Sequence, residues 1–137
     1  IAQLSRVPAS VVKLAISSKQ GATGRDMMDR VMGLVAERLS PAIDSGFFFG
    51  RFSGDQFLVV MPGVDERCAA DRASSWIKAV ISRPLDVGGR PWKAPLIGGV
   101  AECLPEERRD EWVFRADEAM EAAEVQAQRR AMRYSEL

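Results

Sequence analysis

The sequence contains no histidine, and that absence removes several kinds of enzyme at once. Serine–histidine and cysteine–histidine catalysis both use an imidazole as the general base, so neither is available to this chain. A zinc site is also difficult to build, because Cys68 and Cys103 are the only cysteines. Any enzyme here must work with carboxylates, lysine or a hard metal ion, and we interpret both cysteines as reduced thiols.

The sequence also lacks an excess of charge and a long apolar run. Its 19 basic and 19 acidic residues balance, which argues against nucleic acid or an anionic membrane as the main binding partner. No apolar run approaches the roughly 20 residues that cross a bilayer, and no signal peptide opens the chain. Because residue 1 is isoleucine rather than methionine, we expect residues 1–137 to be one domain of a longer, cytoplasmic, multidomain protein.

A β-hairpin is predicted at 47–61, and the other elements can be placed around it. An apolar segment rich in phenylalanine precedes Ser53-Gly54, and the apolar run 58–61 follows it. We expect 47–52 and 56–61 to pair with a turn at Ser53-Gly54, in which glycine supplies a positive φ and Asp55 projects from the mouth of the hairpin. Phe48, Leu58 and Val60 are expected to face the core.

The remaining pattern predicts a mixture of helices and strands. Strands are expected at 11–16 and 94–101, the second with two glycines where another backbone approaches closely or where the sheet bends. Helices are expected after a capping box of Thr23 and Asp26, over 64–82 with Trp76 in the core, and from Pro105 onward to a fraying tail at 128–130. A small hairpin is expected with its tip at 87–90. This order indicates the α+β class, with a ferredoxin-like or palm arrangement of a mostly antiparallel sheet flanked by helices.

Three motifs resemble those of the GGDEF domain, the diguanylate cyclase family. Arg-Phe-Ser-Gly-Asp-Gln-Phe at 51–57 resembles its signature hairpin, Ile-Gly-Gly-Val-Ala at 97–101 one of its strands, and Ala-Asp-Glu-Ala-Met at 116–120 the start of a helix. The resemblance covers roughly 11–130. It implies a palm-like fold whose active members, in bacterial signalling, join two GTP molecules into cyclic dimeric GMP across a homodimer with two divalent ions in each monomer.

The resemblance also implies a set of metal-binding acids, most of which are missing here. In active members one aspartate ends the first strand, another follows two residues later, and the signature supplies two more acids; these positions correspond to Ser17, Lys19, Asp55 and Gln56. Hard divalent ions need oxygen ligands, so Asp55 is the only remaining metal-ligand candidate. The vestigial signature is Ser53, Gly54, Asp55, Gln56 and Phe57, with Gly54 and Asp55 as the candidates for nucleotide contact.

Other positions depart from the family as well. The guanine-reading segment has no counterpart at 18–25, although Asp26 lies near a second guanine-contacting position. The phosphate-binding lysine corresponds to Glu124, and the product-binding inhibitory motif is replaced by Asp44 and Phe47. We therefore expect no cofactor, with Mg²⁺ only if GTP binding is retained, and no cyclic dimeric GMP at the inhibitory positions.

Three hypotheses follow for the function. In the first, a degenerate GGDEF domain no longer catalyses and serves as a regulatory, dimerising or partner-binding module that binds GTP weakly at most. In the second, the chain is an active diguanylate cyclase whose metal ligands come from elsewhere. In the third, it is an unrelated ferredoxin-like structural domain. The first two differ in nucleotide binding with Mg²⁺, and the third differs from both in family membership.

Overall fold

A five-stranded sheet forms the centre of the computed structural model, which describes residues 7–17, 24–93, 95–126 and 130–137. The strands lie in the order β2-β3-β1-β6-β7, and each neighbouring pair is antiparallel except β6 and β7, which are parallel. The bounds in that order are Phe48–Ser53, Gln56–Pro62, Ala9–Ile16, Leu96–Glu102 and Met132–Arg133.

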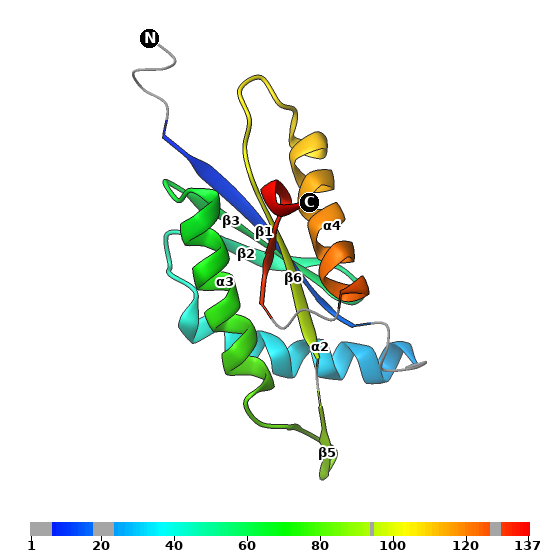
Figure 1. The fold of residues 1–137 in the computed structure, drawn as a ribbon. Coiled ribbons are helices and arrows are strands. Elements are labelled where there is room, and N and C mark those ends of the chain that lie inside the picture. The colour runs from blue at the N-terminus through cyan, green and yellow to red at the C-terminus, as the bar shows by residue number, and fades with distance from the viewer. Residues whose placement is uncertain (1–6, 18–23, 94, 127–129) are drawn as a thin grey trace.

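Helices cover both faces of the sheet (Figure 1). Helices α2 (Arg25–Leu39) and α3 (Glu66–Ile81) pack on one face, and α4 (Arg109–Val125) packs on the other. The short turns η2 (Ser40–Ala42) and η3 (Tyr134–Glu136) and the hairpin of β4 (Leu85–Val87) and β5 (Arg90–Trp92) complete the chain. The expected α+β class, a mostly antiparallel sheet flanked by helices, is confirmed. None of the helices in the described ranges is long and apolar enough to cross a membrane.

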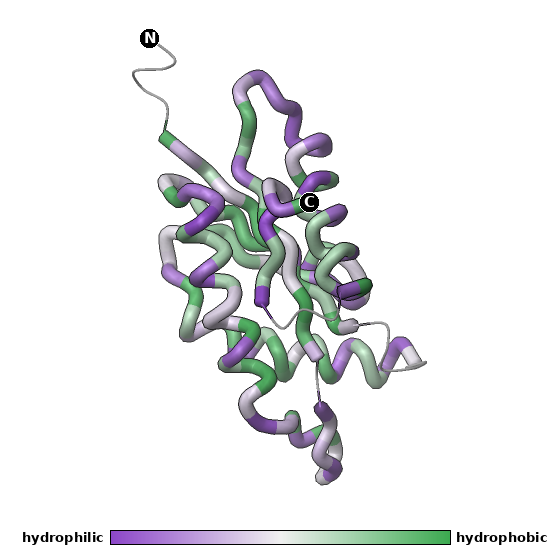
Figure 2. Tube along the Cα trace, in the orientation of Figure 1, coloured by the Kyte–Doolittle hydropathy of each residue, from purple (hydrophilic) through white to green (hydrophobic). Residues whose placement is uncertain are grey.

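Strand β1 is buried on both faces because it lies at the middle of the sheet. Successive side chains of a strand point to opposite faces, so Val12 and Leu14 face the core under α2 and α3, whereas Val11 and Ala15 pack in clusters under α4. Each helix has one buried side. Hydrophobic and hydrophilic residues accordingly alternate along each helix in Figure 2. Trp76 of α3 is buried in the main core, as predicted.

The signature hairpin forms as predicted, but its turn lies one residue later. Ser53 still pairs with Gln56, so the turn residues are Gly54 and Asp55. Gly54 does not adopt a positive φ, in contrast to the prediction. The register instead shifts between Arg51 and Ser53, and this irregularity adds the local twist that closes the turn.

The prediction of which hairpin residues face the core was wrong. Phe57, Val59 and Met61 are the buried residues of β3, whereas Phe48 is 64% exposed. Leu58 and Val60 contact only a smaller cluster beneath α4. Both faces of β3 meet apolar residues, so alternation alone could not identify the face that carries the larger core.

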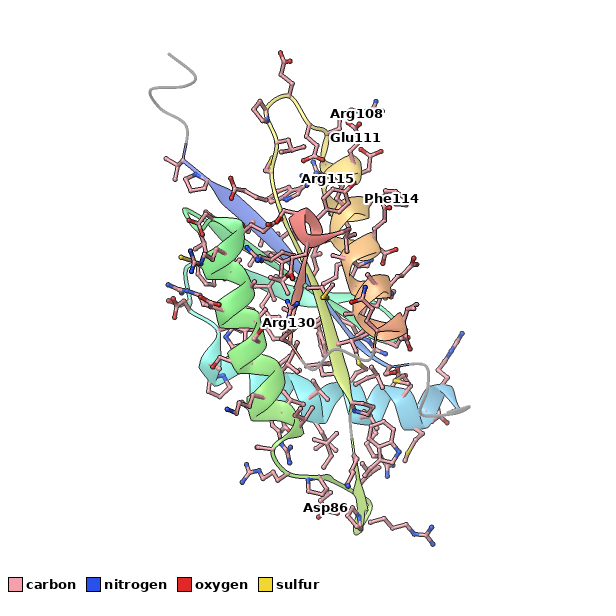
Figure 3. All side chains as sticks on the ribbon, in the orientation of Figure 1. Asp86, Arg108, Glu111, Phe114, Arg115 and Arg130 are labelled. Carbon is pink, nitrogen blue, oxygen red and sulfur yellow. The ribbon has the colours of Figure 1, made fainter. Side chains whose placement is uncertain are left out.

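The starts of helices α2 and α4 differ from the prediction. Gly24 is the N-cap of α2, which puts Asp26 at the second helical position; Thr23 lies outside the described residues. Helix α4 begins at Arg109 rather than near Pro105, and the side chain of Glu111 caps this start by accepting a hydrogen bond of 3.1 Å from the backbone N of Arg108. Figure 3 shows the side chains of Arg108 and Glu111 at the start of α4.

The end of the chain forms structure that the sequence did not predict. Arg130, assigned to a fraying tail, makes two hydrogen bonds of 2.8 Å to Glu136, while 128 and 129 lie outside the described residues. Between Arg130 and Glu136, strand β7 pairs in parallel with β6. A two-residue strand gives no periodic signal, so pattern reasoning could not find it. The small hairpin after α3 is confirmed, with Gly88 and Gly89 at φ 59° and 83°.

At Gly99 of β6 the backbone of α4 approaches the sheet closely, which is one of the two alternatives that the glycine pair suggested. A Cβ at this position would overlap the backbone O of Ala116 and the backbone N of Met120. These are backbone atoms of a long helix, so they cannot move aside as a flexible side chain would. The contact sets how deeply α4 sits on the sheet.

We expect Gly99→Ala to destabilise the fold by roughly 3 kcal/mol or more, because it forces α4 away from the sheet. Urea unfolding followed by circular dichroism measures the loss. Gly46→Ala is the matched control, since a Cβ there meets nothing within 4 Å. Equal stability of the two variants would show that α4 is not held at Gly99.

The ion pair of Arg130 and Glu136 makes part of the stability dependent on pH. The hydrogen bond from Arg130, together with the backbone N–H of Arg133, lowers the pKa of Glu136 from 4.5 to about 2. A carboxyl whose pKa is lower in the folded state stabilises the fold above its unfolded pKa, and this contribution is lost as the pH falls through the folded value.

Glu136→Gln should therefore lower the free energy of unfolding at pH 7 by about 1 kcal/mol, a modest value because the partly exposed pair is screened by solvent. The difference from the parent should shrink as the pH falls from 4.5 towards 2. Thermal melts over this pH range measure it, with Glu121→Gln on the outside of α4 as the control. A difference that did not change with pH would contradict this assignment.

Candidate functional site

The signature turn lies beside the end of the central strand. The backbone O of Asp55 accepts a hydrogen bond of 3.2 Å from the backbone N of Ile16, the last residue of β1. Asp55 is half-buried, and Gln56 pairs with Ala15. The fold thus brings Asp55 to the strand end where the family resemblance places the first metal-binding acid.

Ser17 directly follows β1 and is joined to α4. Its side chain is buried, and its Oγ donates a hydrogen bond of 3.0 Å to Oε1 of Glu124. Its backbone N donates to the backbone O of Pro95 at 2.8 Å. Ser17, Asp55 and Glu124 therefore gather at one end of β1, although they come from distant parts of the sequence. Lys19 lies outside the described residues.

The rest of the signature supports the fold. Phe57 is buried, and its ring centroid lies 5.4 Å from that of Phe49. Arg51 donates to the carbonyl oxygens of Ser53 and Gly54 and forms an ion pair of 2.7 Å with Asp29 of α2. Arg51 thus holds the turn against α2.

The donors near the signature turn do not fit a site for two divalent ions. Within the described ranges, no group of three or more acidic or cysteine side chains is arranged to hold a metal. Two carboxylates, Asp55 and Glu124, belong to this end of the sheet, and Glu124 already accepts the Ser17 hydroxyl. Divalent ions that bind a triphosphate need several oxygen ligands for each ion, so this set is too small.

Two further groups of candidate residues lie elsewhere. Asp44, at an inhibitory-site position, forms an ion pair of 2.8 Å with Arg72. The Arg72 guanidinium lies 5.4 Å from the ring centroid of Phe47, the other position. Asp26 is exposed in the first turn of α2.

Both cysteines are free thiols. A hydrogen bond with Asp65 and the charge of that carboxylate raise the pKa of Cys68. Burial and the nearby Glu107 raise the pKa of Cys103. A thiol is a nucleophile only as its thiolate, so neither cysteine is primed for catalysis.

Lys13 and Asp117 form a buried ion pair that the sequence did not single out. The Nζ of Lys13 lies 3.0 Å from Oδ1 of Asp117, and the side chains are 6% and 28% exposed. Lys13 interrupts the apolar run of β1, and this interruption was the one feature of the sequence that could have indicated a buried ion pair. Asp117 entered the sequence interpretation only as part of a family motif.

Solved structures with the same fold are GGDEF domains. The active GGEEF domain of a diguanylate cyclase from Vibrio cholerae superimposes with a TM-score of 0.78 and 21% identity, over 97% of this chain and 86% of that one. The GGDEF domain of DgcB from Caulobacter crescentus, in complex with c-di-GMP, gives 0.85 and 22%, over 98% and 82%. Diguanylate cyclase SiaD from Pseudomonas aeruginosa, in complex with its activator SiaC, gives 0.84 and 22%, over 96% and 52%.

Comparison with curated proteins found no significant match. The family description "Diguanylate cyclase, GGDEF domain" matches residues 20–130, which is most of the chain and includes the signature hairpin. The hypothesis of an unrelated ferredoxin-like domain is therefore wrong, and the chain belongs to the GGDEF domain family.

Proposed function

We propose that this GGDEF domain does not make cyclic dimeric GMP and acts as a regulatory, dimerising or partner-binding module in cytoplasmic cyclic dimeric GMP signalling. The observation that carries the proposal is the hydrogen bond between Ser17 and Glu124 beside Asp55. The end of β1, where active members need a carboxylate, holds a serine hydroxyl bonded to a glutamate.

The charge of Glu124 opposes nucleotide binding at this end of the sheet. A carboxylate about 4 Å from a triphosphate oxygen is repelled by about 4 kcal/mol at an effective dielectric of about 20, where a lysine would be attracted by a similar amount. In addition, Ser17 brings no negative charge to recruit a divalent ion. Together these residues disfavour both the metal and the phosphates that the cyclase reaction requires.

Two neighbouring structures support regulation through a partner. SiaD is a diguanylate cyclase solved with a protein activator, and another neighbouring structure joins the DgcB GGDEF domain to a coiled coil. We infer that this domain likewise contacts a protein or a second copy of itself. We do not expect cyclic dimeric GMP at the inhibitory positions, because Asp44 is paired with Arg72 and Phe47 presents an apolar ring there.

Incubation of the chain with GTP and Mg²⁺ should yield no cyclic dimeric GMP by liquid chromatography, because Asp55 alone cannot hold the two ions. The active GGEEF domain from Vibrio cholerae, assayed at the same protein concentration, is the positive control. A product peak that disappears in Asp55→Ala would overturn the proposal and favour the cyclase hypothesis. Calorimetry with GTP on the same sample distinguishes a site that binds without turnover from one that does not bind.

Restoring the signature by itself should not create a cyclase. In the variant Ser53→Gly with Gln56→Glu, Ser17 remains at the strand end and Glu124 remains bonded to it. Residues that act as one catalytic unit are not additive, so a partial set recovers little. We expect the double variant to be as inactive as the parent in the chromatographic assay.

A variant that also carries Ser17→Asp and Glu124→Lys is the informative comparison, because it changes both residues of the bonded pair. Thermal melts of every variant confirm folding before the assay. Product from the double variant at a rate clearly above that of the parent would show that Ser17 and Glu124 do not belong to the nucleotide site.

A further inference from the structure

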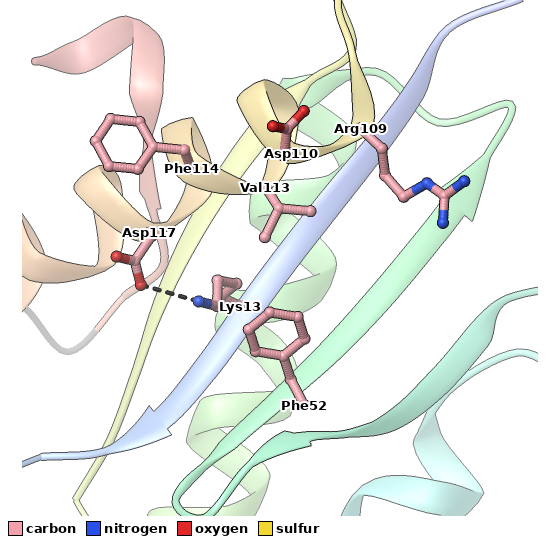
Figure 4. Close-up of a pocket in the computed structure, with 7 residues that line it drawn as sticks. All are labelled: Lys13, Phe52, Arg109, Asp110, Val113, Phe114 and Asp117. Atoms are coloured by element: carbon pink, nitrogen blue, oxygen red, sulfur yellow. Dashed lines mark hydrogen bonds and ion pairs between the residues drawn. The ribbon is translucent and has the colours of Figure 1, made fainter.

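A pocket lies between the strands and α4, and its polar centre is the buried pair of Lys13 and Asp117 (Figure 4). The pocket has a volume of about 660 Å³. Phe52 of β2 lines one side, and Val113 and Phe114 of α4 line the other. We call it the Lys13 pocket. Lys13 is four residues before Ser17 on the same face of β1, roughly 13 Å along the strand at 3.3 Å per residue.

The hydrogen-bonding capacity of Lys13 is incompletely used. Its ammonium has three N–H groups. One is directed to Oδ1 of Asp117 at 3.0 Å, and the ring of Phe52, 4.4 Å from Nζ to centroid, covers another side as a cation–π contact. The Lys13 side chain makes no other hydrogen bond to the described residues and is almost fully buried, so its remaining donor faces the pocket.

Asp117 presents a complementary acceptor beside this donor. Its Oδ1 binds Lys13, while its Oδ2 makes no hydrogen bond to the described residues, and the side chain is 28% exposed. A donor and an acceptor thus belong to the same ion pair and lie at the base of the pocket. A ligand edge that carries one acceptor next to one donor matches this arrangement.

The charges around the pocket favour a neutral ligand. Lys13 is neutralised by Asp117, and the rim carries Arg109 and Asp110, one charge of each sign. The two basic and two acidic groups balance, so neither an anion nor a cation gains a net attraction from them. The walls include apolar side chains, of which Phe52 and Phe114 are 51% and 61% exposed. Exposed aromatic rings at the mouth of a pocket favour a flat, apolar body that can pack against them.

We propose that the Lys13 pocket binds a neutral, planar heterocycle with a lactam edge, that is, a ring carbonyl next to a ring N–H. The carbonyl accepts a hydrogen bond from Lys13, the N–H donates to Oδ2 of Asp117, and the ring packs against Phe52 and Phe114. Binding here does not depend on whether the signature turn catalyses. Changes at Asp55 should therefore leave it unaltered.

Uracil is a suitable probe because it is planar, neutral and carries the lactam edge. Two-dimensional amide NMR of the chain during a uracil titration should give saturable shifts of Lys13, Phe52, Val113 and Asp117, with a dissociation constant in the millimolar range. Dimethyluracil, in which both N–H groups carry methyl groups, should bind at least roughly tenfold more weakly, since a site built for a hydrogen bond rejects a ligand that lacks it.

Three variants complete the test. Phe114→Ser, an exposed change that preserves the fold, and Lys13→Met, which removes the donor, should each weaken uracil binding. Phe48→Ser is the matched control, because Phe48 is an equally exposed phenylalanine of β2 outside the pocket. Absence of saturable shifts, equal binding of dimethyluracil, or equal loss in Phe48→Ser would each overturn the proposal.

Discussion

The burial of β1 between two layers of helices is the constraint on which the rest of the structure depends. Every residue from Ser10 to Ile16 is buried, so both faces of the strand must be covered. Lys13 is the one charged residue among them, and a buried charge is tolerated only with a partner. Asp117 supplies that partner from α4. The ion pair therefore ties α4 to the centre of the sheet, while Gly99 lets the helix backbone come close enough to reach it.

The same strand assembles the candidate site. Its last residue holds the signature turn through the backbone of Asp55, and the next residue, Ser17, contacts Glu124 near the end of α4. None of the side chains at this site belongs to the main core. Acidic residues there can be replaced without loss of the fold, which separates the chemistry of a GGDEF domain from its architecture.

This separation explains how a family fold persists at about one-fifth sequence identity to the solved domains. The constraint that the fold imposes is the two-sided covering of the sheet, which many apolar residues satisfy equally well. The proposed loss of cyclase activity leaves the surfaces available for regulation. In our proposals, the domain contacts a protein partner or a second copy, and the Lys13 pocket binds a small neutral ring.

The sequence by itself determined the class of the fold, the signature hairpin and the helix cores, because turn residues and periodicity are local signals. Only the tertiary structure decided which face of β3 carries the main core, where α4 begins and that β7 forms at all. The contact between Ser17 and Glu124 spans 107 positions. The contact between Lys13 and Asp117 spans 104. Such contacts have no local signature, since they exist only after β1 has been enclosed and α4 has docked on the sheet.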